Sequence, residues 1–226
     1  MLDSAAAAAR DAGVAVVAGD TKVVERGAAG GLIVNTAGIG VVPEGISLGC
    51  DRVREGDAVV VSGTIGDHET AIVVARGGLR IEGVIDSDCA AVHGLVKATL
   101  TACPAARVMR DPTRGGLATT LNEIASAAGV GITLDERAVP VRPAVRAVCD
   151  ILGFDPLYMA CEGKAVAIVP GNAAAAAVAA MRAHPLGRDA AVVGTVGGRR
   201  GVFARTAVGG VRQLIMLEGA QLPRIC

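Results

Sequence analysis

AVVVSGTIGDHETAIVVAR, residues 58–76, is the stretch that decides the fold of this chain. Residues 58–62 predict a buried strand, because they are apolar and rich in β-branched valine. Gly63 and Gly66 then predict a loop, and residues 68–76 predict a helix. A strand, a glycine-rich loop and a helix in this order are typical of a sheet that helices cover, so we predict that a structural unit begins at residue 58.

Strands and helices continue to alternate further along the chain. In one predicted helix, Leu117, Leu121 and Ile124 fall at positions i, i+4 and i+7, which is one helical face. The alternation favours an α/β (α+β) fold with mixed sheets covered by helices. The predicted helices are 89–102, 117–128, 145–152 and 172–183, and the predicted strands are 108–109, 165–169, 190–196, 202–206 and 211–217.

The first part of the chain has fewer predicted elements. Residues 2–12 predict a helix, and residues 14–18 and 32–37 predict two strands. The stretch 38–56 is rich in proline and glycine, which is typical of a connection between domains. We therefore expect a small N-terminal unit and a larger unit after it.

The composition excludes some classes of function. With 226 residues, of which 52% are apolar, the chain can build one large domain or two small ones around a hydrophobic core. Aromatic residues make up only 1%, which excludes the stacking platforms that bind single-stranded nucleic acid. The 22 basic and 22 acidic residues give a formal net charge of zero, which argues against a nucleic-acid or membrane surface.

The cysteine pattern predicts a reducing compartment. The six cysteines form no C-x-x-C pair and no cysteine and histidine ladder with zinc spacing. We find neither a signal peptide nor a run of about 18 apolar residues, so we expect a cytoplasmic protein without a membrane span. The cysteines are Cys50, Cys89, Cys103, Cys149, Cys161 and Cys226.

Two glycine-containing loops are candidate phosphate sites. After the strand 14–18, Asp20 could give Mg²⁺ an oxygen ligand and Lys22 could reach phosphate oxygens, with Thr21 between them; the alternative is a polar turn in solvent. Gly63 and Gly66 precede a helix N-terminus, whose free N–H groups attract phosphate. In that second loop, Asp67 is either part of the site or a plain N-cap, and His68 is either an acid or base or a structural hydrogen-bonding group.

Charged residues also flank two other predicted strands. Arg110, Asp111 and Arg114 lead into a glycine pair at the start of a helix, a combination that suits an oxyanion or phosphate. Glu162 precedes the strand 165–169, where it either takes a proton from a substrate amide or is simply solvated.

The chain ends in Pro223-Arg224-Ile225-Cys226. Chain ends are often poorly ordered, and the roughly nine residues from Glu218 onward span at most about 30 Å when extended. Such an arm can carry a thioester-like cargo on Cys226 from one site to another. The alternative is an incidental, unused cysteine.

These motifs together resemble a known family. They occur in the order and approximate spacing of the HypE family of hydrogenase maturation proteins, which are carbamoyl dehydratases of the aminoimidazole ribonucleotide synthetase and selenophosphate synthetase superfamily. The resemblance covers essentially the whole chain, and its most specific element is the Pro-Arg-Ile-Cys ending. The segments that carry it are 19–24, 62–68, 110–116, 162–164 and 223–226.

The resemblance implies an ATP-dependent dehydration of an S-carbamoyl group on Cys226 to S-cyanide, for the cyanide ligands of the nickel–iron hydrogenase iron. It implies ATP and Mg²⁺ as cofactors, the HypF carbamoyltransferase and the HypC–HypD iron-scaffold complex as partners, and a homodimer. By this analogy Asp20 helps to hold Mg²⁺ and ATP, Lys22 lies near the phosphates or the carbamoyl group, and Glu162 takes the amide proton. Arg110, Asp111 and Arg114 would shape the cleft that the tail enters.

The resemblance also implies a division of the chain into domains. Relatives have a further N-terminal segment with a phosphate and metal site, so we expect the N-terminal domain to be incomplete here, and they usually have asparagine where this chain has Cys161. Two other interpretations remain open: another ATP-dependent synthetase or kinase of the superfamily, and a non-catalytic carrier or docking fragment. The expected parts are the rest of an ATP-binding and dimerisation domain (1–43), a linker (44–57), a C-terminal α+β domain (58–217) and a tail (218–226).

Overall fold

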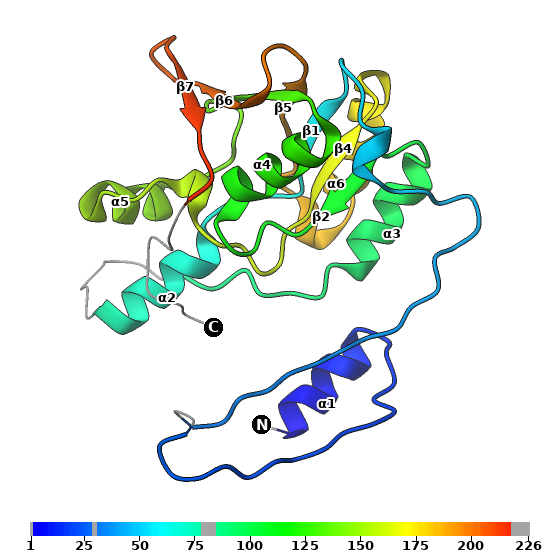
Figure 1. Ribbon diagram of the computed structural model, residues 1–226, viewed down its shortest axis with the longest axis vertical. Helices are drawn as coiled ribbons and strands as arrows, with labels where there is room; N and C mark the ends of the chain where they lie inside the picture. Colours follow the sequence, from blue (N-terminus) through cyan, green and yellow to red (C-terminus); the bar gives the residue numbers. More distant parts are fainter. Residues whose placement is uncertain (1, 29–30, 78–84, 218–226) are drawn as a thin grey trace. The chain divides into compact units, whose positions relative to one another are not determined.

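The computed structural model describes residues 2–28, 31–77 and 85–217, and the chain divides into two compact units, residues 1–46 and 47–226. The larger unit contains one seven-stranded mixed sheet in the order β2-β4-β1-β5-β3-β6-β7 (Figure 1). Only the β3–β6 pair is parallel among the pairs of these seven strands. The strands are β1 (Ala58–Val61), β2 (Val108–Arg110), β3 (Gly131–Asp135), β4 (Val166–Val169), β5 (Ala191–Val196), β6 (Gly201–Arg205) and β7 (Val211–Leu214).

Helices cover both faces of this sheet (Figure 1). Side chains alternate along a strand, so Val59 and Val61 pack with Leu121 of α4 on one face. Val60, between them, packs with Met181 of α6 and with residues of α3 on the other face. The helices are α1 (Leu2–Asp11), α2 (Asp67–Gly77), α3 (His93–Ala102), α4 (Gly116–Ala128), α5 (Pro143–Leu152) and α6 (Ala174–Arg182), with short 3-10 turns at Cys50–Arg52, Pro156–Tyr158, Gly171–Ala173 and Pro185–Gly187.

This architecture confirms the predicted fold class, a mixed α/β sheet covered by helices. The prediction omitted β3, whose five residues contain glycine, threonine and aspartate and show no long apolar run. It also began α3 at residue 89, whereas that helix begins at His93. The residues before His93 make contacts to other loops instead, and these contacts matter for the candidate site.

The smaller unit corrects two predictions. Residues 14–18 and 32–37, all of them described, are not strands, and α1 is the regular element of residues 2–46 that the structure describes. Apolar β-branched residues favour a strand only where another strand satisfies its backbone N–H and C=O groups. Many apolar side chains of this unit are accordingly exposed, including Val17, Val23, Ile39 and Val41.

None of the helices in residues 2–28, 31–77 and 85–217 is long and apolar enough to cross a bilayer.

Candidate functional site

Three loops meet at one end of the sheet. β1 and β2 both run antiparallel to β4, and Val61 of β1 and Arg110 of β2 both lie opposite Val166 at the start of β4. The loop after β1, the loop after β2 and the loop before β4 therefore lie at the same end. The strand order thus brings together the motifs around Gly63, Arg114 and Glu162, which are far apart in the sequence.

Cys161 ties these three loops together. The Gly66 backbone N–H donates a hydrogen bond to the Cys161 Sγ at 3.3 Å, and the Cys161 N–H donates to the Pro112 carbonyl oxygen at 3.0 Å. The side chain is fully buried, and this burial raises the pKa of its thiol strongly. Cys161 is thus an uncharged structural link immediately before Glu162, and the Gly66 N–H is engaged within the protein.

Asp67 is a completely buried carboxylate at the first position of α2. It accepts a hydrogen bond from the Thr64 hydroxyl, and its Oδ1 lies 3.3 Å from Arg142 Nε. Burial raises the pKa of Asp67, while Thr64, Arg142 and Lys164 act in the opposite direction. Buried carboxylates with raised pKa values concentrate at functional sites, although ion-pair networks also produce them.

Glu162 is held by its backbone. Its N–H donates to Asp88 Oδ1 at 2.9 Å, and Lys164 Nζ lies 3.8 Å from Asp88 Oδ2. Within the described part of the chain, the Glu162 carboxylate has no hydrogen-bond or ion-pair partner, and the residue is half-buried. This arrangement leaves the Glu162 carboxylate available to a substrate, while the Lys164 ammonium group faces Asp88. Sequence reasoning missed Asp88, because it lies in a short polar run with no periodic pattern.

The remaining predicted residues of the larger unit fall at the margin of these loops. His68 Nδ1 lies 2.8 Å from Ser87 Oγ, which is a local hydrogen bond between side chains. Arg110 pairs with Glu123 of α4 at 2.8 Å on the surface. Asp111 and Arg114 are exposed.

The predicted residues of the smaller unit lie on its surface. Asp20, Thr21 and Lys22 are all exposed, and Asp20 Oδ1 accepts a hydrogen bond from the Thr21 N–H at 2.8 Å. They belong to residues 1–46, a separate compact unit from the three loops. Cys226 lies outside the described residues.

The other cysteines differ in their availability. The five in the described residues are all free thiols. Cys103, Cys149 and Cys161 are buried, and burial raises the pKa of the Cys149 thiol to about 11. A thiol that stays protonated and buried is a poor nucleophile. Cys89 is the exposed thiol among the five.

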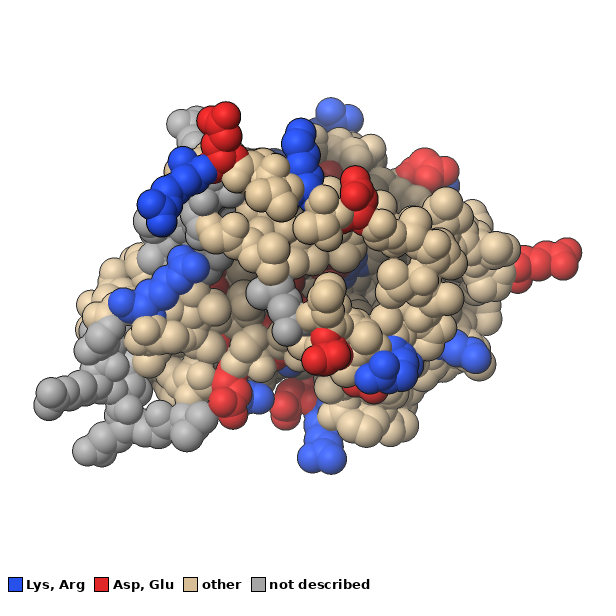
Figure 2. Space-filling view, turned by 90° about the horizontal axis from the view of Figure 1, so that it is seen from below, with Lys and Arg blue, Asp and Glu red and all other residues tan. Residues whose placement is uncertain are grey.

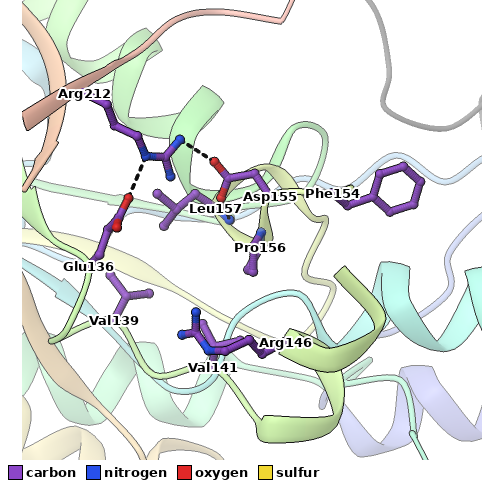
Figure 3. Close-up of a pocket in the computed structure, with 9 residues that line it drawn as sticks. All are labelled: Glu136, Val139, Val141, Arg146, Phe154, Asp155, Pro156, Leu157 and Arg212. Carbon is purple, nitrogen blue, oxygen red and sulfur yellow. Dashed lines mark hydrogen bonds and ion pairs between the residues drawn. The ribbon is translucent and has the colours of Figure 1, made fainter. Parts of the chain in front are cut away.

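A cavity of about 210 Å³ lies elsewhere, between the loop after β3 and the start of the 3-10 turn Pro156–Tyr158 (Figure 3). Arg212, which lines this cavity, forms ion pairs with Glu136 and Asp155 at 2.6 Å each. None of the predicted site residues lines this cavity. On the face shown in Figure 2, basic and acidic side chains are interspersed, in keeping with the zero net charge.

Comparison with known proteins defines the class. The family described as "AIR synthase related protein, C-terminal domain" matches residues 54–206, the part of the chain that forms most of the sheet and the three loops. The chain therefore has the AIR synthase related fold.

More specific relatives define the family. The carbamoyl dehydratase HypE of Azotobacter vinelandii is 54% identical over 228 residues, which cover 100% of this chain and 67% of that protein. HypE of Cupriavidus necator is also 54% identical, over 228 residues that cover 100% of this chain and 65% of that protein. The chain belongs to the HypE family, and it spans about two thirds of the length of these curated relatives.

Solved structures agree with this assignment. The crystal structure of E. coli HypE is 47% identical with a TM-score of 0.94, covering 99% of this chain and 69% of that chain. A HypE–HypF complex is 41% identical with a TM-score of 0.88 (95% and 70% covered). A HypE structure in complex with ATP is 44% identical with a TM-score of 0.84 (97% and 68% covered).

Proposed function

We propose that this chain carries out the HypE reaction, the ATP-dependent dehydration of an S-carbamoyl group on Cys226 to S-cyanide in hydrogenase maturation. The observation that carries the proposal is the turn Glu162-Gly163-Lys164 in a chain of the HypE family. Asp88 holds the Glu162 N–H and the Lys164 ammonium group, and among the described residues the Glu162 carboxylate has no partner. The burial and raised pKa values of Cys103, Cys149 and Cys161 make these three poor acceptor thiols, which leaves Cys50, Cys89 and Cys226. The resemblance to the HypE family selects Cys226 among them.

The chemistry needs one phosphoryl transfer and two proton losses. The carbamoyl oxygen attacks the γ-phosphorus of ATP, so an O–P bond forms, ADP leaves, and the amide nitrogen loses its first proton. The C–O bond then breaks, phosphate leaves with the oxygen, and the second N–H electron pair completes the carbon–nitrogen triple bond. We assign one of these protons to Glu162, because its carboxylate has no partner among the described residues and can act as a general base. Phosphate is the better leaving group than an amide oxygen.

The residues present fit ATP and Mg²⁺ in part. Lys164 is a cation beside Gly63, and a lysine at a glycine loop suits phosphate oxygens. Asp20 is an exposed carboxylate of the kind that Mg²⁺ uses together with phosphate ligands. No group of three or more metal-binding side chains exists among the residues that the structure describes. Bound ATP supplies the phosphoryl group.

The proposal includes partners. The HypE–HypF complex among the solved relatives supports HypF as the protein that loads the carbamoyl group. We further propose the HypC–HypD complex as the acceptor of cyanide, a homodimer, and a cytoplasmic location. The exposed apolar residues of the smaller unit are consistent with a dimer, since such surfaces often mark interfaces.

Mass spectrometry of Cys226→Ala tests the proposal. After incubation with HypF, carbamoyl phosphate and MgATP, the wild-type chain should gain a carbamoyl group and then lose one water. The variant should gain neither mass, because its acceptor thiol is gone. Cys89→Ala, which removes the exposed cysteine of the described residues, should behave like wild type. A modified Cys226→Ala chain would disprove the assignment, and an unmodified wild-type chain would favour another synthetase or a docking fragment.

A further inference from the structure

The segment 86–89 lies between α2 and α3 and makes several contacts with the Glu162 turn. Asp88 is the centre of these contacts. Its side chain is only 2% exposed, although it belongs to a stretch without regular structure. A carboxylate is seldom so deeply buried unless it is paired or hydrogen-bonded.

Asp88 uses its two oxygens for two different residues of one turn. Oδ1 accepts the Glu162 N–H at 2.9 Å, and Oδ2 lies 3.8 Å from Lys164 Nζ. Asp88 Oδ2 has no hydrogen bond of its own among the described residues, so the ion pair is its compensation. The Asp88 side chain therefore holds both the backbone N–H of Glu162 and the ammonium group of Lys164.

Gly163 fits this arrangement. A Cβ atom at position 163 would overlap the Asp88 carbonyl oxygen and would lie 2.9 Å from the Ala90 nitrogen. The turn and the segment 88–90 are thus in backbone contact, which requires glycine between Glu162 and Lys164. Ser87 extends the contact to the start of α2, because its hydroxyl lies 2.8 Å from His68 Nδ1.

We propose that Asp88 is a positioning residue of the dehydratase site: it holds Glu162 by its backbone and Lys164 by its charge, so that the Glu162 carboxylate stays unpaired and directed to the substrate. The inference rests on the proposed function of Glu162. A general base that is misplaced by about 1 Å can lose about 100-fold in rate, so the loss of such a support affects the chemical step. ATP binding should change little, because Lys164 keeps its charge beside Gly63 when Asp88 is replaced.

The test compares Asp88→Ala, Asp88→Asn and the control Asp86→Asn, an exposed aspartate in the same segment. We expect the single-turnover conversion of carbamoylated Cys226 to slow about 10- to 100-fold in Asp88→Ala. Asp88→Asn should slow it less, because its carbonyl oxygen still accepts the Glu162 N–H. The Kd for MgATP should stay within about two-fold in both variants, and Asp86→Asn should match wild type.

Two further measurements keep the inference falsifiable. Thermal unfolding shows which variants are folded. If Asp88→Ala does not fold, the rate of Asp88→Asn decides the outcome. Hydrogen exchange of the Glu162 amide should be faster in Asp88→Ala, whether or not the chain is active. A folded variant with the wild-type rate, or with equal losses of rate and ATP affinity, would overturn the inference. A wild-type chain that converts nothing would overturn the proposed function, and unchanged amide exchange would then overturn the positioning role as well.

Discussion

Asp67, Asp88 and Lys164 place three formal charges within one buried loop cluster, and Arg142 adds a fourth at its edge. Removing these charges from water costs free energy. Buried charges of this kind are expected mainly at functional sites. The motif residues Gly63, Gly66 and Glu162 were predictable because glycine and charged residues beside an apolar strand stand out in the sequence. Asp88 was not, since its importance depends on a contact 74 residues away.

Asp67→Asn should stabilise the protein at neutral pH. Because burial raises the folded-state pKa of Asp67, its ionised form lowers stability, and this contribution grows as pH rises from the ordinary value of 3.8 through the folded pKa. Asparagine stays neutral and still accepts the Thr64 hydrogen bond. We expect a gain of roughly 1 kcal/mol in the free energy of unfolding at pH 8 that vanishes near pH 4. Urea unfolding at both pH values measures it.

The exposed Asp150→Asn on α5 is the matched control and should change little at either pH. If Asp67→Asn instead lowers stability at pH 8, the attraction of Arg142 and Lys164 outweighs the cost of burial. Asp67 would then be a structural ion-pair residue.

Single elements were predictable where the apolar pattern was long. Leu117, Leu121 and Ile124 lie on the buried face of α4, and residues 58–61 form the buried strand β1. Both were predictable, because each apolar pattern matches the period of one kind of element. Residues 14–18 have an equally apolar pattern and are not a strand. A strand depends on hydrogen bonds to a neighbour, and local sequence does not encode whether that neighbour is present.

Leu121→Ala should therefore be strongly destabilising. Leu121 is fully buried between α4 and the sheet, and its truncation leaves a cavity that costs about 2–5 kcal/mol in the free energy of unfolding. Ile151→Ala on α5 is the control, because Ile151 is 71% exposed, and it should cost less than about 0.5 kcal/mol. Chemical denaturation of both variants provides the comparison. Similar values for the two would mean that α4 does not pack as described.

At the scale of the whole molecule, the chain divides unequally. The unit 47–226 contains the seven strands and the three buried clusters found in the described residues, so it has its own hydrophobic core. The unit 1–46 contains α1, none of whose residues is buried. A unit with so little internal burial contributes little to stability by itself, so its apolar side chains gain most from contact with another surface.

Deletion of residues 1–46 should therefore leave the melting temperature of the remaining chain within a few degrees of the whole chain, because the main core is retained. The same deletion should abolish self-association, since it removes exposed apolar residues available to a second copy, Ile39, Val41 and Val17 among them. Sedimentation velocity over a range of concentrations measures the second effect, and the substitutions Ile39→Asp and Val41→Asp should reproduce it without the deletion.

The exposed Val208→Asp in the β6–β7 hairpin is the control and should leave association unchanged. A whole chain that sediments as a monomer at every concentration would contradict the proposed homodimer, whereas a large drop in melting temperature after the deletion would show that the two units fold as one.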